Sequence, residues 1–60
     1  MNKQTKRLVK KIVKAYGPDL LSITVSDEYI EIYYFNYRGD LIRNLYSGGI
    51  EITETIVEGV

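Results

Sequence analysis

The sequence predicts an α+β fold, in which one N-terminal amphipathic helix packs on a four-stranded antiparallel β-meander in the order α-β-β-β-β. Apolar residues recur with a helical period before Gly17-Pro18 and with a period of two after it. Turn-forming residues also separate the alternating segments. A chain of 60 residues is enough for one domain. We therefore expect a single small α+β domain over residues 1–60, with a helix at about 3–16 and strands at about 20–26, 29–37, 40–47 and 50–57.

The helix is predicted from apolar side chains that share one side of a helical projection. They are Leu8, Val9, Ile12, Val13, Ala15 and Tyr16. Asn2 suits the N-cap, because its side chain can accept a hydrogen bond from the first turn. Gly17 can take a left-handed cap, and Pro18 prevents the helix from continuing. The helix is therefore expected to end just before Gly17.

Charge is divided sharply along the chain. Six cations and no acid precede Pro18, namely Lys3, Lys6, Arg7, Lys10, Lys11 and Lys14. The remainder holds all eight acids against Arg38 and Arg43, so the two parts carry +6 and −6. On a helix the six cations lie opposite the apolar side chains, so one face of the helix is basic throughout.

Three pairs of turn residues predict the strand register. Asp27-Glu28, Arg38-Gly39 and Gly48-Gly49 each suit a two-residue hairpin turn. Those turns place nine apolar residues on the face that meets the helix, namely Leu21, Ile23, Val25, Ile30, Ile32, Leu41, Leu45, Ile52 and Ile56. A competing interpretation makes residues 53–58 a short helix instead of a fourth strand.

The same register predicts an aromatic-rich sheet face turned away from the helix. Its members are Tyr29, Tyr33, Phe35, Tyr37, Ile42 and Tyr46. Aromatic residues favour strands in any case, so a single tyrosine there needs no functional explanation. Six large side chains together exceed what a monomer normally leaves exposed, and tyrosine is enriched at interfaces. The pattern therefore favours a protein interface.

Composition argues against catalysis. The chain has no histidine and no cysteine, which removes the usual bases, nucleophiles and zinc ligands. Glu31 and Glu51 flank Tyr46 in the expected register and resemble a carboxylate pair, but two solvated charges are the commoner explanation. We therefore expect no enzyme activity, no catalytic residues, no metal, no cofactor and no small-molecule substrate.

The chain also carries no sign of a membrane protein. No apolar run approaches the roughly 20 residues that span a bilayer. The basic start leads into an amphipathic segment, which is not typical of a signal peptide. We therefore expect a cytoplasmic protein without a membrane partner.

Two classes of function remain. The first is a protein-binding module that acts as a regulator or inhibitor through the aromatic face. Its partner is a second copy of the chain, in a homodimer, or another protein. The second is nucleic-acid binding by the six cations of the helix, which would attract phosphates in a salt-sensitive way. Base stacking on the aromatic face is disfavoured, because those side chains and the cations lie on opposite sides of the fold.

Overall fold

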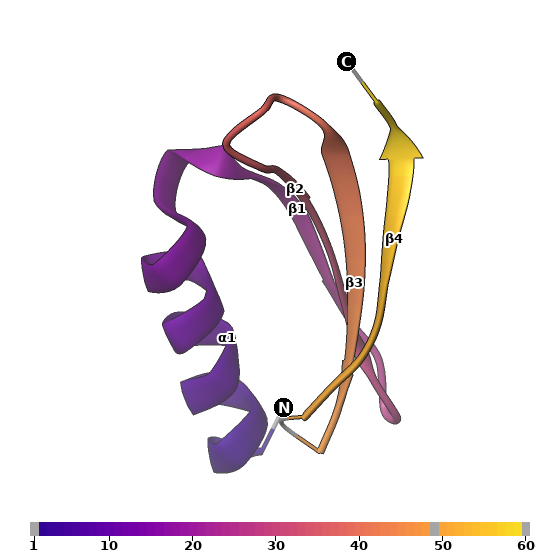
Figure 1. Ribbon diagram of the computed structural model, residues 1–60. Coiled ribbons are helices and arrows are strands. Elements are labelled where there is room, and N and C mark those ends of the chain that lie inside the picture. The colour runs from indigo at the N-terminus through magenta and orange to yellow at the C-terminus, as the bar shows by residue number, and fades with distance from the viewer. Residues whose placement is uncertain (1, 49, 60) are drawn as a thin grey trace.

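The structure is a computed structural model that describes residues 2–48 and 50–59. Its elements are helix α1 (Lys3–Tyr16), a short 3-10 turn η1 (Gly17–Asp19), and strands β1 (Leu20–Val25), β2 (Ile30–Phe35), β3 (Leu41–Ser47) and β4 (Ile50–Glu58). The strands form one antiparallel sheet in the order β1-β2-β3-β4 (Figure 1). The predicted fold class and element order are confirmed, and residues 53–58 are strand rather than helix.

Both ends of α1 are closed as the sequence predicts. The Asn2 side-chain oxygen accepts a hydrogen bond of 2.7 Å from the Thr5 N–H. Gly17 has φ +57°, and its N–H donates to the carbonyl of Val13. Pro18 then lies in η1, where its fixed φ suits a tight turn that leads the chain back into β1.

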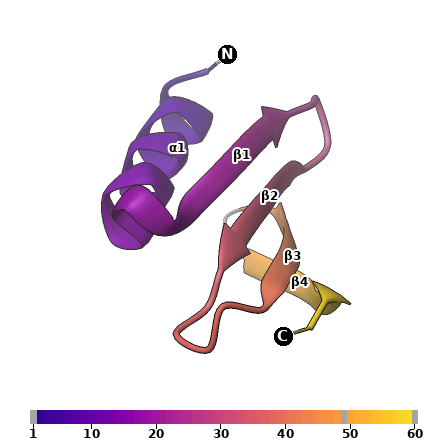
Figure 2. The ribbon, with the colours of Figure 1, turned by 90° about the horizontal axis from the view of Figure 1, so that it is seen from above.

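The core lies between α1 and one face of the sheet, which we call the inner face. Ile12 of α1 packs there with Ile30 and Ile32 of β2. Figure 2 shows α1 beside β1, with β4 at the far side of the sheet. All nine residues of β4 are accordingly exposed. The helix therefore covers only part of the inner face, and the core is concentrated near β1 and β2.

The first hairpin has the predicted register over most of its length. Val25 pairs with Ile30 and Ile23 with Ile32, on either side of the expected turn. A β-bulge between Leu20 and Ser22 then shifts the pairing by one residue. Leu20 therefore lies opposite Tyr34, and Leu21, a predicted core residue, is 58% exposed.

The second hairpin differs from the prediction in the length of its loop. Tyr37, Arg38 and Gly39 form a loop closed by the Asn36 N–H, which donates to the Asp40 carbonyl at 3.0 Å. The Asn36 side-chain oxygen accepts from the N–H groups of Arg38 and Asp40, at 2.9 Å each. Gly39 has φ +87°, a conformation that glycine adopts without steric strain. The loop thus has one residue more than the two-residue turn that we expected.

That extra residue inverts β3. Ile32 pairs with Asn44, whereas the prediction paired it with Leu45. Since successive side chains point to opposite faces, a slip of one residue exchanges the faces of the whole strand. The predicted positions of four residues are therefore wrong: Ile42 and Tyr46 lie on the inner face, and Leu41 and Leu45 on the other.

The third hairpin begins as predicted and then shifts. Ser47 pairs with Ile50 across the expected turn, although Gly49 lies outside the described residues. A β-bulge follows, because Tyr46 pairs with Glu51 but Leu45 pairs with Thr53. Ile52 and Ile56, two predicted core residues, are 57% and 58% exposed, since α1 does not reach over β4.

Candidate functional site

No described element covers the side of the sheet that faces away from α1. We call this side the outer face. Its central residues come from β2 and β3. They are Glu31, Tyr33, Phe35, Leu41, Arg43 and Leu45. Tyr33 pairs across the strands with Arg43, and Phe35 pairs with Leu41. The outer face is therefore mainly apolar and aromatic, with two charges at its centre.

Those two charges form an ion pair. The Arg43 Nε donates to a Glu31 carboxylate oxygen at 2.6 Å. This hydrogen bond raises the pKa of Arg43 above its ordinary value. The side chains of Arg43 and Glu31 are 35% and 21% exposed. The pair neutralises the centre of the outer face but remains accessible to a partner.

The structure divides the six predicted interface residues among three places. Tyr33 and Phe35 lie on the outer face as expected. Tyr29 directly precedes β2 and is 43% exposed, and Tyr37 lies in the hairpin loop and is 94% exposed. Ile42 is only 2% exposed, and Tyr46 packs against the core. The outer face gains Leu41 and Leu45, which the predicted register had assigned to the core, together with Arg43.

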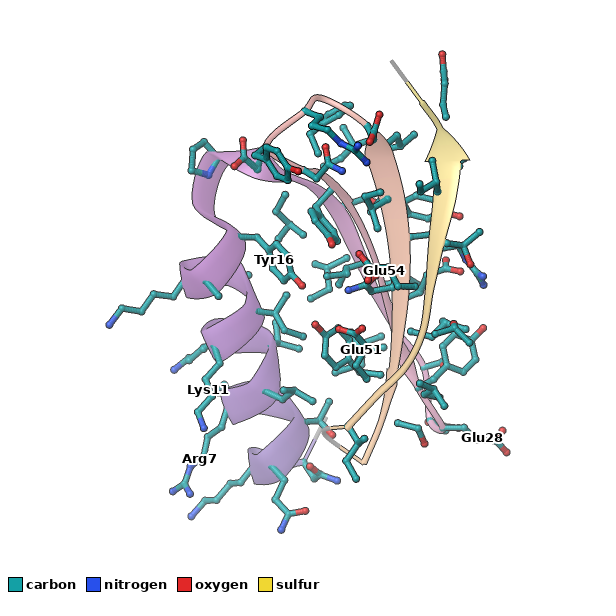
Figure 3. All side chains as sticks on the ribbon, in the orientation of Figure 1. Arg7, Lys11, Tyr16, Glu28, Glu51 and Glu54 are labelled. Atoms are coloured by element: carbon teal, nitrogen blue, oxygen red, sulfur yellow. The ribbon has the colours of Figure 1, made fainter. Side chains whose placement is uncertain are left out.

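A second group of polar side chains gathers on the inner face, between α1 and β4. This inner polar cluster comprises Tyr16, Tyr34, Asn44, Tyr46, Glu51 and Glu54. The Tyr16 and Tyr46 hydroxyls are 3.0 Å apart, and the Tyr34 hydroxyl donates to Glu54 at 3.1 Å. The Asn44 Nδ2 donates to the Tyr16 hydroxyl at 3.4 Å and to Glu51 at 3.2 Å. Figure 3 shows Tyr16, Glu51 and Glu54 in the space between the helix and the sheet.

A β-bulge brings the two glutamates of this cluster to the same face. Residues three apart on a regular strand point in opposite directions. Glu51 pairs with Tyr46 and Glu54 with Asn44, and both of these partners lie on the inner face. The extra residue of the bulge is what permits this arrangement. Bulges frequently redirect side chains next to functional sites.

Burial changes the acidity of two phenols in the cluster. Desolvation, followed by the hydrogen bond to Tyr46, raises the pKa of Tyr16 well above its usual range. Desolvation and the hydrogen bond to Glu54 also raise the pKa of Tyr34. The two rings contact each other, with centroids 4.4 Å apart. Both phenols therefore keep their protons to higher pH than an exposed tyrosine does.

Alkaline conditions are expected to destabilise the protein through these two phenols. Unfolded tyrosines release their protons near a pKa of about 10, and the folded Tyr16 and Tyr34 hold theirs to higher pH. The folded state then binds more protons, so the free energy of unfolding falls as the pH rises above about 10 and is unaffected by these groups below it. Thermal unfolding between about pH 8 and about pH 11 checks this.

Two variants make the pH experiment specific. Tyr16→Phe should show a shallower loss of stability with rising pH than the wild-type chain. Tyr37→Phe, which alters a tyrosine that is 94% exposed, should keep the wild-type slope. Equal slopes for wild type and Tyr16→Phe would contradict the assignment.

The structure separates the residues of the carboxylate pair considered from the sequence. Glu31 lies on the outer face, while Glu51 and Tyr46 lie on the inner face. Within residues 2–48 and 50–59, no group of three or more acidic, histidine or cysteine side chains could hold a metal ion. In the same part of the chain, no helix is long and apolar enough to cross a membrane.

The basic face of α1 is open to solvent. Its six cations are all exposed, and Figure 3 shows Arg7 and Lys11 pointing away from the sheet. The ion pairs among the described residues are Arg38–Asp40, at 3.1 Å, and Arg43–Glu31. Neither involves α1, so the positive charge of the helix is not neutralised by ion pairs within the described chain.

Comparisons with known proteins add no assignment. No protein-family model, curated protein or solved structure matches this chain. Three surfaces of the described chain are candidates for function: the outer face, the inner polar cluster and the basic face of α1.

Proposed function

We propose that the protein is a small non-enzymatic protein-binding module, a homodimeric regulator or inhibitor whose contact surface is the outer face. One observation carries the proposal: Tyr33, Phe35, Leu41 and Leu45 surround a central ion pair on a face that no other described element covers. Tyrosine and arginine are the residue types that most often dominate binding energy at interfaces. The absence of cysteine fits a cytoplasmic location for this role.

A second copy of the chain is the partner that this surface suits best. A two-fold interface requires a surface complementary to itself. Arg43 and Glu31 give the face one positive and one negative charge, so each can meet the opposite charge of the other copy. A chain of this size also buries little apolar surface as a monomer. Its core lies on one side of the sheet only, and dimerisation would stabilise the fold by burying apolar surface on the other side.

Replacing Tyr33 and Phe35 together by serine is expected to weaken dimerisation about 100-fold, because each aromatic ring contributes buried area at the centre of the interface. Sedimentation equilibrium of wild-type and variant chains measures the change. Ile56→Ser serves as a control, since Ile56 is also exposed, at 58%, but lies on the inner face. A monomeric wild-type chain, or equal weakening by Ile56→Ser, would contradict the proposal.

A second candidate function, nucleic-acid binding, is favoured by the exposed cations of α1. With no acid on the helix and no ion pair to the described sheet, these side chains can neutralise phosphates. Binding to a fluorescent DNA duplex should weaken steeply with salt concentration. Arg7→Gln and Lys11→Gln should each lower the slope of log affinity against log salt by about one, whereas Arg38→Gln should not. No binding at low salt would exclude this function.

A further inference from the structure

We propose that the inner polar cluster binds the guanidinium group of an arginine side chain from a partner protein. The cluster lies on the opposite face of the sheet from the surface proposed for dimerisation. It is assembled from four elements, namely α1, β2, β3 and β4. Four features of the cluster favour such a ligand: its balance of hydrogen-bond donors and acceptors, one buried oxygen, its local charge and the geometry of its rings.

The cluster has more hydrogen-bond acceptors than donors. Glu51 and Glu54 are exposed carboxylates, and each accepts one hydrogen bond within the cluster. A carboxylate offers about four acceptor sites, so most of its capacity is unused. The donors are the three phenols and the Asn44 amide, and these are largely engaged with one another. A ligand that supplies several N–H groups would complete the network.

Asn44 provides the most specific sign of a missing donor. Its side chain is 1% exposed, and its amide nitrogen lies within the cluster, bonded to the Tyr16 hydroxyl and to Glu51. Its Oδ1 is buried and accepts no hydrogen bond within the described chain. The reverse orientation of the amide would place the carbonyl against the Glu51 carboxylate, which is repulsive. A buried acceptor without a donor costs about 1–3 kcal/mol, a large penalty for a chain this small.

The local charge also favours a cation. β4 carries Glu51, Glu54 and Glu58 and no basic residue. Within residues 2–48 and 50–59, neither Glu51 nor Glu54 takes part in an ion pair. The β-bulge that turns both carboxylates to the inner face concentrates two negative charges beside the buried amide. An incoming cation would therefore be attracted to this point of the inner face.

A guanidinium group fits this arrangement better than an ammonium group. It offers five N–H donors in one plane and can bridge two carboxylates, whereas an ammonium group has three donors around one point. Its flat face also stacks on aromatic rings. Tyr16 and Tyr34 present such rings next to the glutamates, with their centroids 4.4 Å apart. The site thus combines planar hydrogen bonding with an aromatic surface.

Titration of the intact chain with a blocked arginine tests the proposal. The probe is Nα-acetyl-arginine amide, and the readout is the NMR signal of the Asn44 side-chain amide. We expect a saturable shift with a dissociation constant of about 1–10 mM, as a single side chain would give. The blocked lysine should bind at least about fivefold more weakly, and blocked citrulline, the neutral isostere, should give no shift. Equal binding of all three probes would overturn the proposal.

Charge-matched variants locate the site. Glu51→Gln with Glu54→Gln should weaken arginine binding at least about tenfold, while the glutamine oxygens can still accept from Asn44 and Tyr34. Glu28→Gln with Glu58→Gln removes the same charge elsewhere and should change binding less than about twofold. Figure 3 shows Glu28 well away from the cluster. Equal losses in both double variants would overturn the proposal, because they would indicate attraction by net charge alone.

The test is independent of the dimer. Tyr33→Ser with Phe35→Ser alters only the outer face, so this double variant should bind the blocked arginine as the wild-type chain does. Loss of arginine binding in that variant, with the fold intact by circular dichroism, would likewise count against a separate inner site.

Discussion

Ile32→Ala is expected to lower the free energy of unfolding by about 2–5 kcal/mol, the range for truncating a buried isoleucine side chain to alanine. Ile32 is 0% exposed, and it packs between Ile12 of the helix and the rest of the sheet. At the usual stability per residue, a chain of 60 residues is expected to have a total stability of only about 3–9 kcal/mol. The substitution should therefore leave a large fraction of the protein unfolded, which urea denaturation followed by circular dichroism would show.

Ile52→Ala is the matched control for that experiment. It removes the same atoms from a strand of the same sheet, but Ile52 is 57% exposed. Its effect should stay within about 1 kcal/mol, because little apolar surface returns to water. Equal losses for the two substitutions would mean that the core does not lie where the structure places it.

Asn36→Ala is expected to cost about 2–3 kcal/mol through the loop between β2 and β3. The substitution removes two hydrogen bonds from backbone N–H groups to the Asn36 side-chain oxygen. It also removes the bond of 3.1 Å from the Asn36 Nδ2 to the carboxylate of Asp40, a residue that is only 7% exposed. Each lost bond contributes about 1 kcal/mol, and bonds to charged groups contribute more.

Tyr37→Ala separates this loss from a general effect on the loop. Tyr37 neighbours Asn36 but is 94% exposed, so its truncation should change the free energy of unfolding by less than about 0.5 kcal/mol. Urea denaturation of both variants measures the two changes in the free energy of unfolding. If Asn36→Ala were as mild as Tyr37→Ala, the hydrogen bonds of Asn36 would not be what holds the hairpin.

The helix and the first hairpin were predictable because local signals determine them. Asn2 and Gly17 mark the two ends of α1 through bonds within one turn of the chain. The turn at Asp27-Glu28 is closed by the neighbouring Ser26 and Tyr29, so the pairing of Val25 with Ile30 follows from adjacent residues. In these segments, periodicity and turn chemistry agree with each other, and the fold class follows from them.

The faces of β3 were predicted wrongly, because they depend on the length of one loop. Arg38-Gly39 suits a two-residue turn, but glycine is also favoured as the last residue of a three-residue loop. An asparagine at position 36, whose side chain can accept from nearby N–H groups, was the available sign of the longer loop. Tyr46 and Ile42 were assigned to the wrong face for this reason, and so was part of the candidate interface.

The inner polar cluster could not be predicted from periodicity at all. Tyr16 and Tyr46 are 30 residues apart and meet only because α1 packs against the inner face of the sheet. Glu51 and Glu54 share a face only because of a β-bulge, and alternation by itself places them on opposite faces. Sites of this kind depend on irregular features, and these are what pattern-based prediction omits.

The exposure of β4 has a consequence for how the molecule opens. Its nine residues are held to the rest of the sheet chiefly by backbone hydrogen bonds to β3, and they bury little apolar surface. Such a strand can detach at a lower free energy than that of global unfolding, leaving the helix and three strands in place. Glu51 and Glu54 would detach with β4. A ligand bound by these carboxylates would therefore stabilise the attached state of β4, because it binds that state and not the detached one.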